Sequence, residues 1–134
     1  MASMRWWLAI AVAGVPITIA RCSPSKEAGV TCTEIGCASG LQVQLDRSPS
    51  AGYTVEVFPP GSGAKYSFEC PSGQCGTTIF FEDFTPDYVN VRIIVGTDTS
   101  FAEALQPQYT DLRPNGEQCP PACHIGRVAA TTPP

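Results

Sequence analysis

The clearest pattern in the chain is an alternation of apolar and polar positions over residues 88–95, Tyr-Val-Asn-Val-Arg-Ile-Ile-Val, in which Ile94 is the one apolar residue on the polar face. One face takes the β-branched residues Val89, Val91, Ile93 and Val95. A period of two with β-branched residues on the apolar side predicts a β-strand. Such a strand needs partners to cover its valines, so the pattern predicts the core of a β-sandwich.

Similar but shorter patterns predict further strands, separated by clusters of Gly, Pro and Ser. These segments are 30–35, 41–45, 53–57, 65–69, 77–81 and 125–130. Residues 99–105 and 108–112 are weaker, and 101–105 fits one turn of helix as well as an irregular strand. About seven strands at this spacing, without a repeat or a long helix, are typical of an antiparallel β-sandwich.

The N-terminus has the layout of a secretory signal peptide. A short positively charged start, Met1–Arg5, precedes the apolar stretch Trp6–Ala20. That stretch is short for a transmembrane helix, which needs about 20 residues. We therefore interpret residues 1–21 as a signal peptide. We expect the rest of the chain to consist of a flexible tether over 22–29, a β-sandwich domain over 30–130 and a frayed tail over 131–134.

The chain that remains after such a cleavage is acidic. Two of the eight basic residues, Arg5 and Arg21, precede Cys22, whereas all twelve acidic residues follow it, which gives a formal charge of −6. No basic cluster is present. This composition argues against a nucleic-acid partner and against electrostatic binding to anionic lipid.

Seven cysteines predict three disulfides and one cysteine with a separate role. Cys70 and Cys75 flank turn residues, so a bridge across that hairpin is expected. Two prolines stiffen the stretch between Cys119 and Cys123. Cys32 and Cys37 are therefore expected to pair with Cys119 and Cys123, in an order that the sequence leaves open. The pair spacings and export argue against zinc, so no metal is expected.

The remaining cysteine follows Ile19-Ala20-Arg21, and Ile19–Cys22 resembles a bacterial lipobox. The resemblance implies that Cys22 is lipidated and becomes the mature N-terminus of a membrane-anchored lipoprotein of the cell envelope. Arg21 departs from the small residue usual before that cysteine. The alternative is cleavage after Ala20 and a freely secreted protein with a reactive thiol.

Two strand patterns, Tyr53-Thr-Val-Glu-Val and Tyr88-Val-Asn-Val-Arg-Ile, resemble immunoglobulin-like and fibronectin type III domains. The resemblance implies an Ig-like sandwich, with Tyr88 as a tyrosine corner. The chain departs from antibody domains because both its tryptophans, Trp6 and Trp7, lie in the leader. A prealbumin-like or carboxypeptidase-regulatory sandwich is equally compatible.

Candidate catalytic residues are few. His124 is the only histidine and is interpreted as a surface residue at the domain end. Glu82, Asp83 and Asp87 form the one local carboxylate cluster. Calcium binding there is disfavoured because the ordered loop pattern is absent, and a glycosidase pair lacks room for a sugar cleft. We expect no enzyme activity and no cofactor, with a site at this cluster as the alternative.

The aromatic residues Phe58, Phe80 and Phe84, together with this carboxylate cluster, are the candidate binding surface; burial in the core is the competing interpretation. The sequence thus favours a non-enzymatic binding or accessory module with an unknown envelope or extracellular protein as its partner. Its only membrane contact would be the lipid anchor. The alternative is a secreted binding protein or hydrolase inhibitor that acts through rigid loops such as 58–63.

Overall fold

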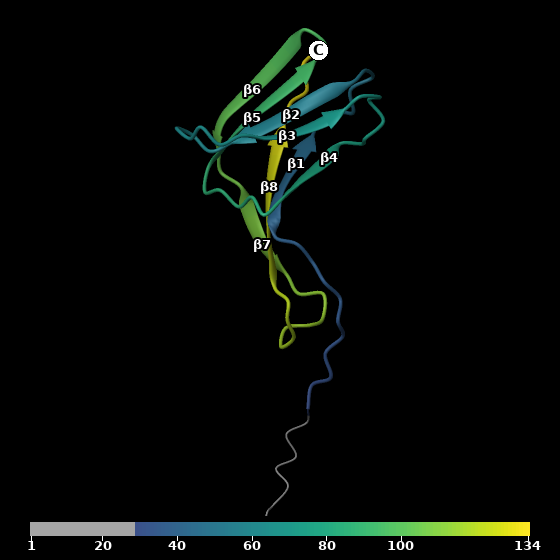
Figure 1. The fold of residues 1–134 in the computed structure, drawn as a ribbon, viewed down its shortest axis with the longest axis vertical. Helices are drawn as coiled ribbons and strands as arrows, with labels where there is room; N and C mark the ends of the chain where they lie inside the picture. The colour runs from purple at the N-terminus through teal and green to yellow at the C-terminus, as the bar shows by residue number, and fades with distance from the viewer. Residues whose placement is uncertain (1–28) are drawn as a thin grey trace, which may run out of the picture.

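The computed structural model describes residues 29–134, which form two four-stranded sheets packed face to face (Figure 1). The strands are β1 (Gly40–Leu45), β2 (Tyr53–Phe58), β3 (Tyr66–Cys70), β4 (Thr78–Glu82), β5 (Val89–Val95), β6 (Asp98–Leu105), β7 (Gln108–Leu112) and β8 (Cys123–Ala130). This described part contains no helix. The prediction of an all-β, disulfide-stapled sandwich is confirmed. The signal peptide, Cys22 and most of the tether lie outside the described residues.

The two sheets have the strand orders β4-β1-β8-β7 and β3-β2-β5-β6. All neighbours are antiparallel except β1 and β8, which run parallel. The architecture is that of an Ig-like sandwich, but the order of the strands in the sheets differs from that of antibody domains. Antibody domains pair their first strand with the second in one sheet, whereas β1 here lies between β4 and β8.

The core lies between the sheets and follows the alternation of the sequence. Val89, Val91 and Ile93 of β5 are at most 1% exposed, and the inward residues of β1 and β2 are at most 4% exposed. The remaining core side chains include Leu41, Val43, Leu45, Tyr53, Val55, Val57, Ile79, Phe81 and Val128. Apolar burial on this scale is the main favourable term in folding such a sandwich.

Strand β6 carries a bulge that explains its weak sequence pattern. The pairing of β5 with β6 shifts between Val89 and Val91, and Ala104 adopts a positive φ of 49°. The side chain of Asn90, only 6% exposed, accepts a hydrogen bond from the Ala104 N–H at 2.8 Å. The bulge adds one residue to β6 and so interrupts the alternation of inward and outward side chains along it. For this reason the sequence of residues 101–105 shows neither a clear strand pattern nor a clear helix pattern.

We expect Asn90→Ala to lower the free energy of unfolding by about 1–3 kcal/mol, because the Ala104 N–H loses its acceptor. Urea unfolding of the purified protein measures this. Thr54→Ala, at an outward position of the neighbouring β2, is the control and should change the stability by less than about 0.5 kcal/mol. Equal losses in the two variants would contradict the role given to Asn90.

Residues 29–39 and 113–122 leave the sandwich together and form a narrow extension, here called the stalk (Figure 1). It is held by the Cys32–Cys119 bridge and, at its base, by Cys37–Cys123. The third bridge is Cys70–Cys75. The predicted hairpin bridge is thus confirmed, as is the pairing of the other four cysteines, and the structure supplies their order.

The predicted strand over 30–35 is wrong. Val30 and Ile35 are 57% and 55% exposed and belong to no sheet. The Asn115 side chain bonds the main chain instead, accepting from the Ile35 N–H at 3.0 Å and donating to its carbonyl at 2.9 Å. The Asn115 amide thus makes the two main-chain hydrogen bonds at Ile35 that a neighbouring strand would make in a sheet. The first strand of the sandwich begins at Gly40.

The predicted frayed tail is wrong as well. Thr132 is 4% exposed, and its N–H donates to the Asp46 carboxylate at 2.8 Å. The Arg47 guanidinium donates to the Pro133 carbonyl. The hydrogen bond from the Thr132 hydroxyl holds the pKa of Asp46 below its usual value. These contacts dock the C-terminal residues onto the loop that follows β1.

Candidate functional site

The outward side of the β3-β2-β5-β6 sheet, here called the outer face, carries an exposed cluster of one arginine and two phenylalanines. The pairing of β5 with β6 sets Arg92 opposite Phe101. The Phe58 and Phe101 rings are stacked with centroids 6.1 Å apart, and Arg92 Cζ lies 5.6 Å and 5.8 Å from them. Phe101 is 51% exposed. We call Phe58, Arg92 and Phe101 the Arg–Phe cluster.

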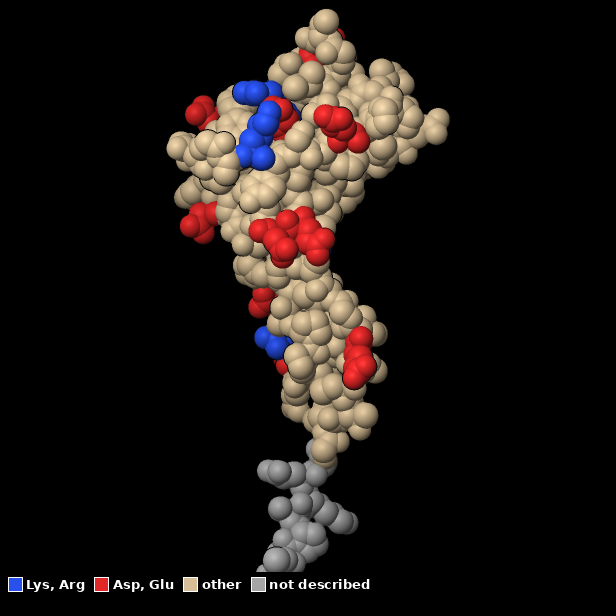
Figure 2. Space-filling view, in the orientation of Figure 1, with Lys and Arg blue, Asp and Glu red and all other residues tan. Residues whose placement is uncertain are grey.

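A buried carboxylate fixes the arginine in this position. Glu56, 8% exposed, lies opposite Arg92 in the sheet and accepts from its guanidinium at 3.1 Å. Lys65 pairs with the other oxygen of the same carboxylate. Figure 2 shows basic side chains gathered against a carboxylate over this sheet. The hydrogen bond from Lys65, with the nearby charge of Arg92, holds the pKa of Glu56 below its usual 4.5.

This lowered pKa predicts acid sensitivity. Folded protein binds fewer protons at Glu56 than unfolded protein, so the stabilisation is complete above pH 4.5 and is lost as the pH falls through the lower folded value. We expect Glu56→Gln to flatten the fall in unfolding free energy between about pH 5 and 3. Glu69→Gln, an exposed carboxylate on β3, is the control. An unchanged slope in Glu56→Gln would contradict the assignment.

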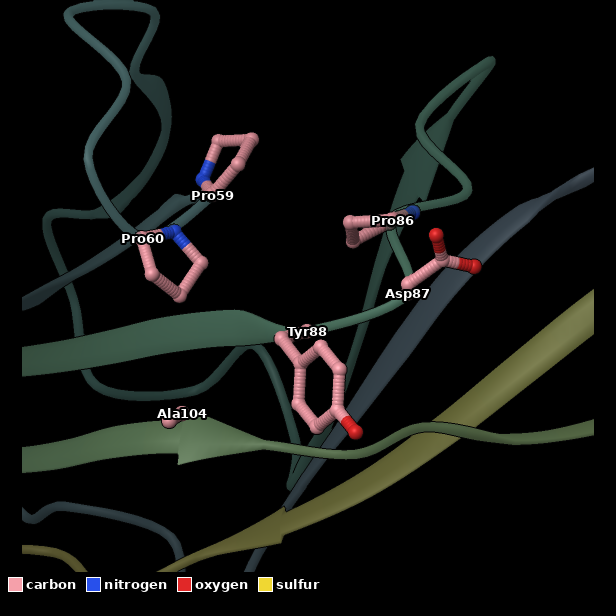
Figure 3. Close-up of a pocket in the computed structure, with 6 residues that line it drawn as sticks. All are labelled: Pro59, Pro60, Pro86, Asp87, Tyr88 and Ala104. Atoms are coloured by element: carbon pink, nitrogen blue, oxygen red, sulfur yellow. The ribbon is translucent and has the colours of Figure 1, made fainter.

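Pro59, which directly follows Phe58 of the Arg–Phe cluster, is part of the lining of an apolar groove of about 580 Å³. Figure 3 shows two proline rings of the β2–β3 loop on one side, a third proline across from them and the Tyr88 ring between. Ala104, on the β6 bulge, completes the lining, and Asp87 is the one charged residue in it. The groove is lined by Pro59, Pro60, Pro86, Asp87, Tyr88 and Ala104.

Local sequence explains this shape. Pro59 directly follows the last residue of β2, and Pro86 stands three residues before β5 begins. Proline cannot extend a central ladder, so β2 ends and β5 begins in rigid loops at the same end of the sheet. The Asn90 contact fixes the bulge that brings Ala104 to the groove.

The structure separates the predicted binding residues. Phe58 belongs to the Arg–Phe cluster and Asp87 to the groove. Phe84 is 5% exposed and packs on Tyr66 at 4.4 Å between ring centroids, so it offers no surface. Phe80 is 42% exposed, but on β4 of the other sheet.

Glu82 ends β4, and Asp83 follows it in the turn, with φ at 56° and its N–H bonded to the Ser39 carbonyl. Glu82 is thus on the same strand as Phe80, in the other sheet, and Asp83 lies just beyond the end of that strand. Residues 29–134 contain no grouping of three or more His, Cys, Asp or Glu side chains suited to a metal ion.

Sequence reasoning missed Arg92, Phe101, Tyr88 and Ala104 as site residues. The outward position of Arg92 was visible in the alternation, and so was the cluster of prolines after Phe58. Joining them requires the register of β2, β5 and β6, which no local pattern encodes.

His124 lies outside the outer face and pairs with Asp111 across β7 and β8. The Nδ1 atom is 2.8 Å from Asp111 Oδ1, and the imidazole stacks on Tyr109 at 4.4 Å. This hydrogen bond holds the pKa of Asp111 below its usual value. Ser39 contacts only the main chain here, because its Oγ accepts from the His124 N–H. Among the described residues, the one side chain hydrogen-bonded to the His124 ring is Asp111.

The tyrosine-corner interpretation of Tyr88 is not supported, since Tyr88 is 50% exposed and lines the groove. The tie from a tyrosine hydroxyl to a loop comes from Tyr109, which donates to the Pro86 carbonyl at 2.7 Å. Burial, with the nearby charge of Asp87, raises the pKa of Tyr109. Tyr109 thereby helps to fix the loop that carries one wall of the groove.

No protein-family model matches the chain, and neither does any curated protein or solved structure. Over residues 29–134, no helix is long and apolar enough to cross a membrane.

Proposed function

We propose that the protein is an exported, non-enzymatic binding module of the cell envelope, anchored through lipid on Cys22, which engages a protein partner with its outer face. The observation that carries the binding role is the combination of the Arg–Phe cluster on one sheet and the apolar groove at the end of that sheet, where Pro59 directly follows Phe58. Arginine and aromatic side chains are enriched at protein interfaces and dominate their binding energies.

The cluster is also prepared for binding. Glu56 holds the Arg92 guanidinium, and the two phenylalanine rings pack against it. Side chains that are already ordered lose less conformational entropy when a partner covers them. A charge that is already paired is also less costly to bury than a free one.

The stalk supports the anchored arrangement. Residues 29–39 leave the sandwich at the end opposite the C-terminus, so the described chain begins away from the two sheets (Figure 1). Three disulfides suit an oxidising compartment outside the cytoplasm. An anchor at Cys22 would then leave the outer face free for a partner.

Site-specific photocrosslinking in the intact envelope of the native cells tests the binding role. A photoreactive phenylalanine analogue replaces Phe101 in one strain and Phe80 in the other. The two rings have similar exposure but lie on opposite sheets. We expect a discrete protein adduct from position 101 alone. No adduct at 101, or the same adducts from both positions, would count against the outer face.

A further inference from the structure

We propose that the groove binds an extended peptide segment of the partner, with apolar side chains next to a basic residue. This inference rests on the proposed function and names the class of ligand. The groove lies between the β2–β3 loop, the segment before β5 and the bulge of β6 (Figure 3).

The lining selects for apolar side chains. Three proline rings, the face of Tyr88 and the methyl group of Ala104 form most of the wall. These groups are rigid, so little side-chain entropy is lost when they are covered. Grooves bordered by aromatic rings are a recurring way to bind extended, proline-containing segments.

The small residue at position 104 keeps the groove open. Asn90 holds the Ala104 main chain in the bulge, at a positive φ. Beta-branched and bulky residues are rarest in that conformation, so the backbone geometry disfavours a large side chain here. The space above the bulge is thereby left to a ligand.

The charges around the groove select a basic residue. Asp87 is the one charged residue in its lining, and no basic residue in the described part of the chain lines it. Lys65 and Arg92, the basic side chains of the outer face, are both paired with Glu56. A cation in the groove therefore meets the Asp87 carboxylate, for which no ion pair is found among the described residues, whereas an acidic peptide meets like charge.

Selection from a random-peptide phage library on the full mature protein tests this. We expect the enriched peptides to carry a lysine or arginine next to proline or aliphatic residues. Their affinity should fall at least tenfold in Asp87→Lys and stay within twofold in Asp98→Lys. Asp98 is an exposed carboxylate at the other end of β6, so the two variants make the same charge change. Circular dichroism checks that both fold.

Three results would overturn the inference: no enrichment over a blank surface, enriched peptides that are acidic, or equal binding to wild type and Asp87→Lys. A self-association seen by sedimentation and abolished by Tyr88→Ser would assign the groove to a second copy of the chain instead. If the library fails while position 101 still crosslinks a protein, the binding role stands and only the peptide class is wrong.

Discussion

Removing either stalk disulfide alone should lower the unfolding free energy by about 3 kcal/mol, and removing both by about 7 kcal/mol. Each bridge on its own closes a long loop, with sequence separations of 87 and 86 residues. When one bridge is intact, however, the other closes only a small ring. This ring consists of the two short segments between the bridges, because Cys32 and Cys37 are five positions apart and Cys119 and Cys123 are four apart. In the chain-entropy model, the first bridge to form therefore carries most of the stabilisation.

The variants are Cys32→Ser/Cys119→Ser, Cys37→Ser/Cys123→Ser and the fourfold combination, each unfolded in urea. Because a domain of this size is stable by about 5–15 kcal/mol, the fourfold variant should be close to unfolding. Cys70→Ser/Cys75→Ser is the control: its small loop should contribute about 2 kcal/mol, additively with either stalk bridge. If the loss of unfolding free energy in the fourfold variant equals the sum of the losses in the two double variants, the two stalk bridges do not close the same long loop.

Cys22→Ala should move the protein from the membrane fraction to the soluble fraction, an all-or-none change. Under the proposal, the acyl chains on Cys22 are the sole attachment, and each buried methylene contributes about 0.8 kcal/mol to membrane binding. Fractionation of the native cells with immunodetection measures this. Ser23→Ala, next to the anchor, should leave the protein in the membrane. Retention of Cys22→Ala in the membrane would contradict the anchor.

The sequence predicted those parts of the fold in which one local pattern decides the outcome. In β1, β2 and β5, β-branched and leucine residues alternate with polar ones, and these strands became the buried centre. The disulfide between Cys70 and Cys75 followed from the turn residues between them. The stiff Cys119–Cys123 segment likewise excluded a bridge within itself, which left the stalk pairing.

The failures arise where distant contacts override the local pattern. Residues 30–35 have strand-forming composition, but Asn115 and two disulfides hold them apart from either sheet. The end of the chain is polar and rich in proline, which is typical of a free tail. Thr132 nevertheless docks on Asp46, a residue far away in sequence. No local signal marks such a pair.

The candidate site shows the same limit. Phe58 and Asp87 were predicted as binding residues, but each became part of a site only through its neighbours across the sheet. Arg92 acquires its role from Glu56, opposite it on β2, and from Phe101 on β6. Beyond this pair the bulge at Ala104 shifts the register of β5 and β6 by one residue, from Val91–Ala102 to Val89–Leu105. Sequence alternation assigns a face to each side chain, whereas register decides which side chains meet.

The most direct test of the anchored, exported module is the intact mass of the protein isolated from its own cells, with and without thiol alkylation. We expect a chain that begins at Cys22, carries acyl groups and has no alkylated thiol, because the other six cysteines are paired. A chain that begins at Arg21 with one alkylated thiol would contradict the lipid anchor and would indicate a freely secreted protein.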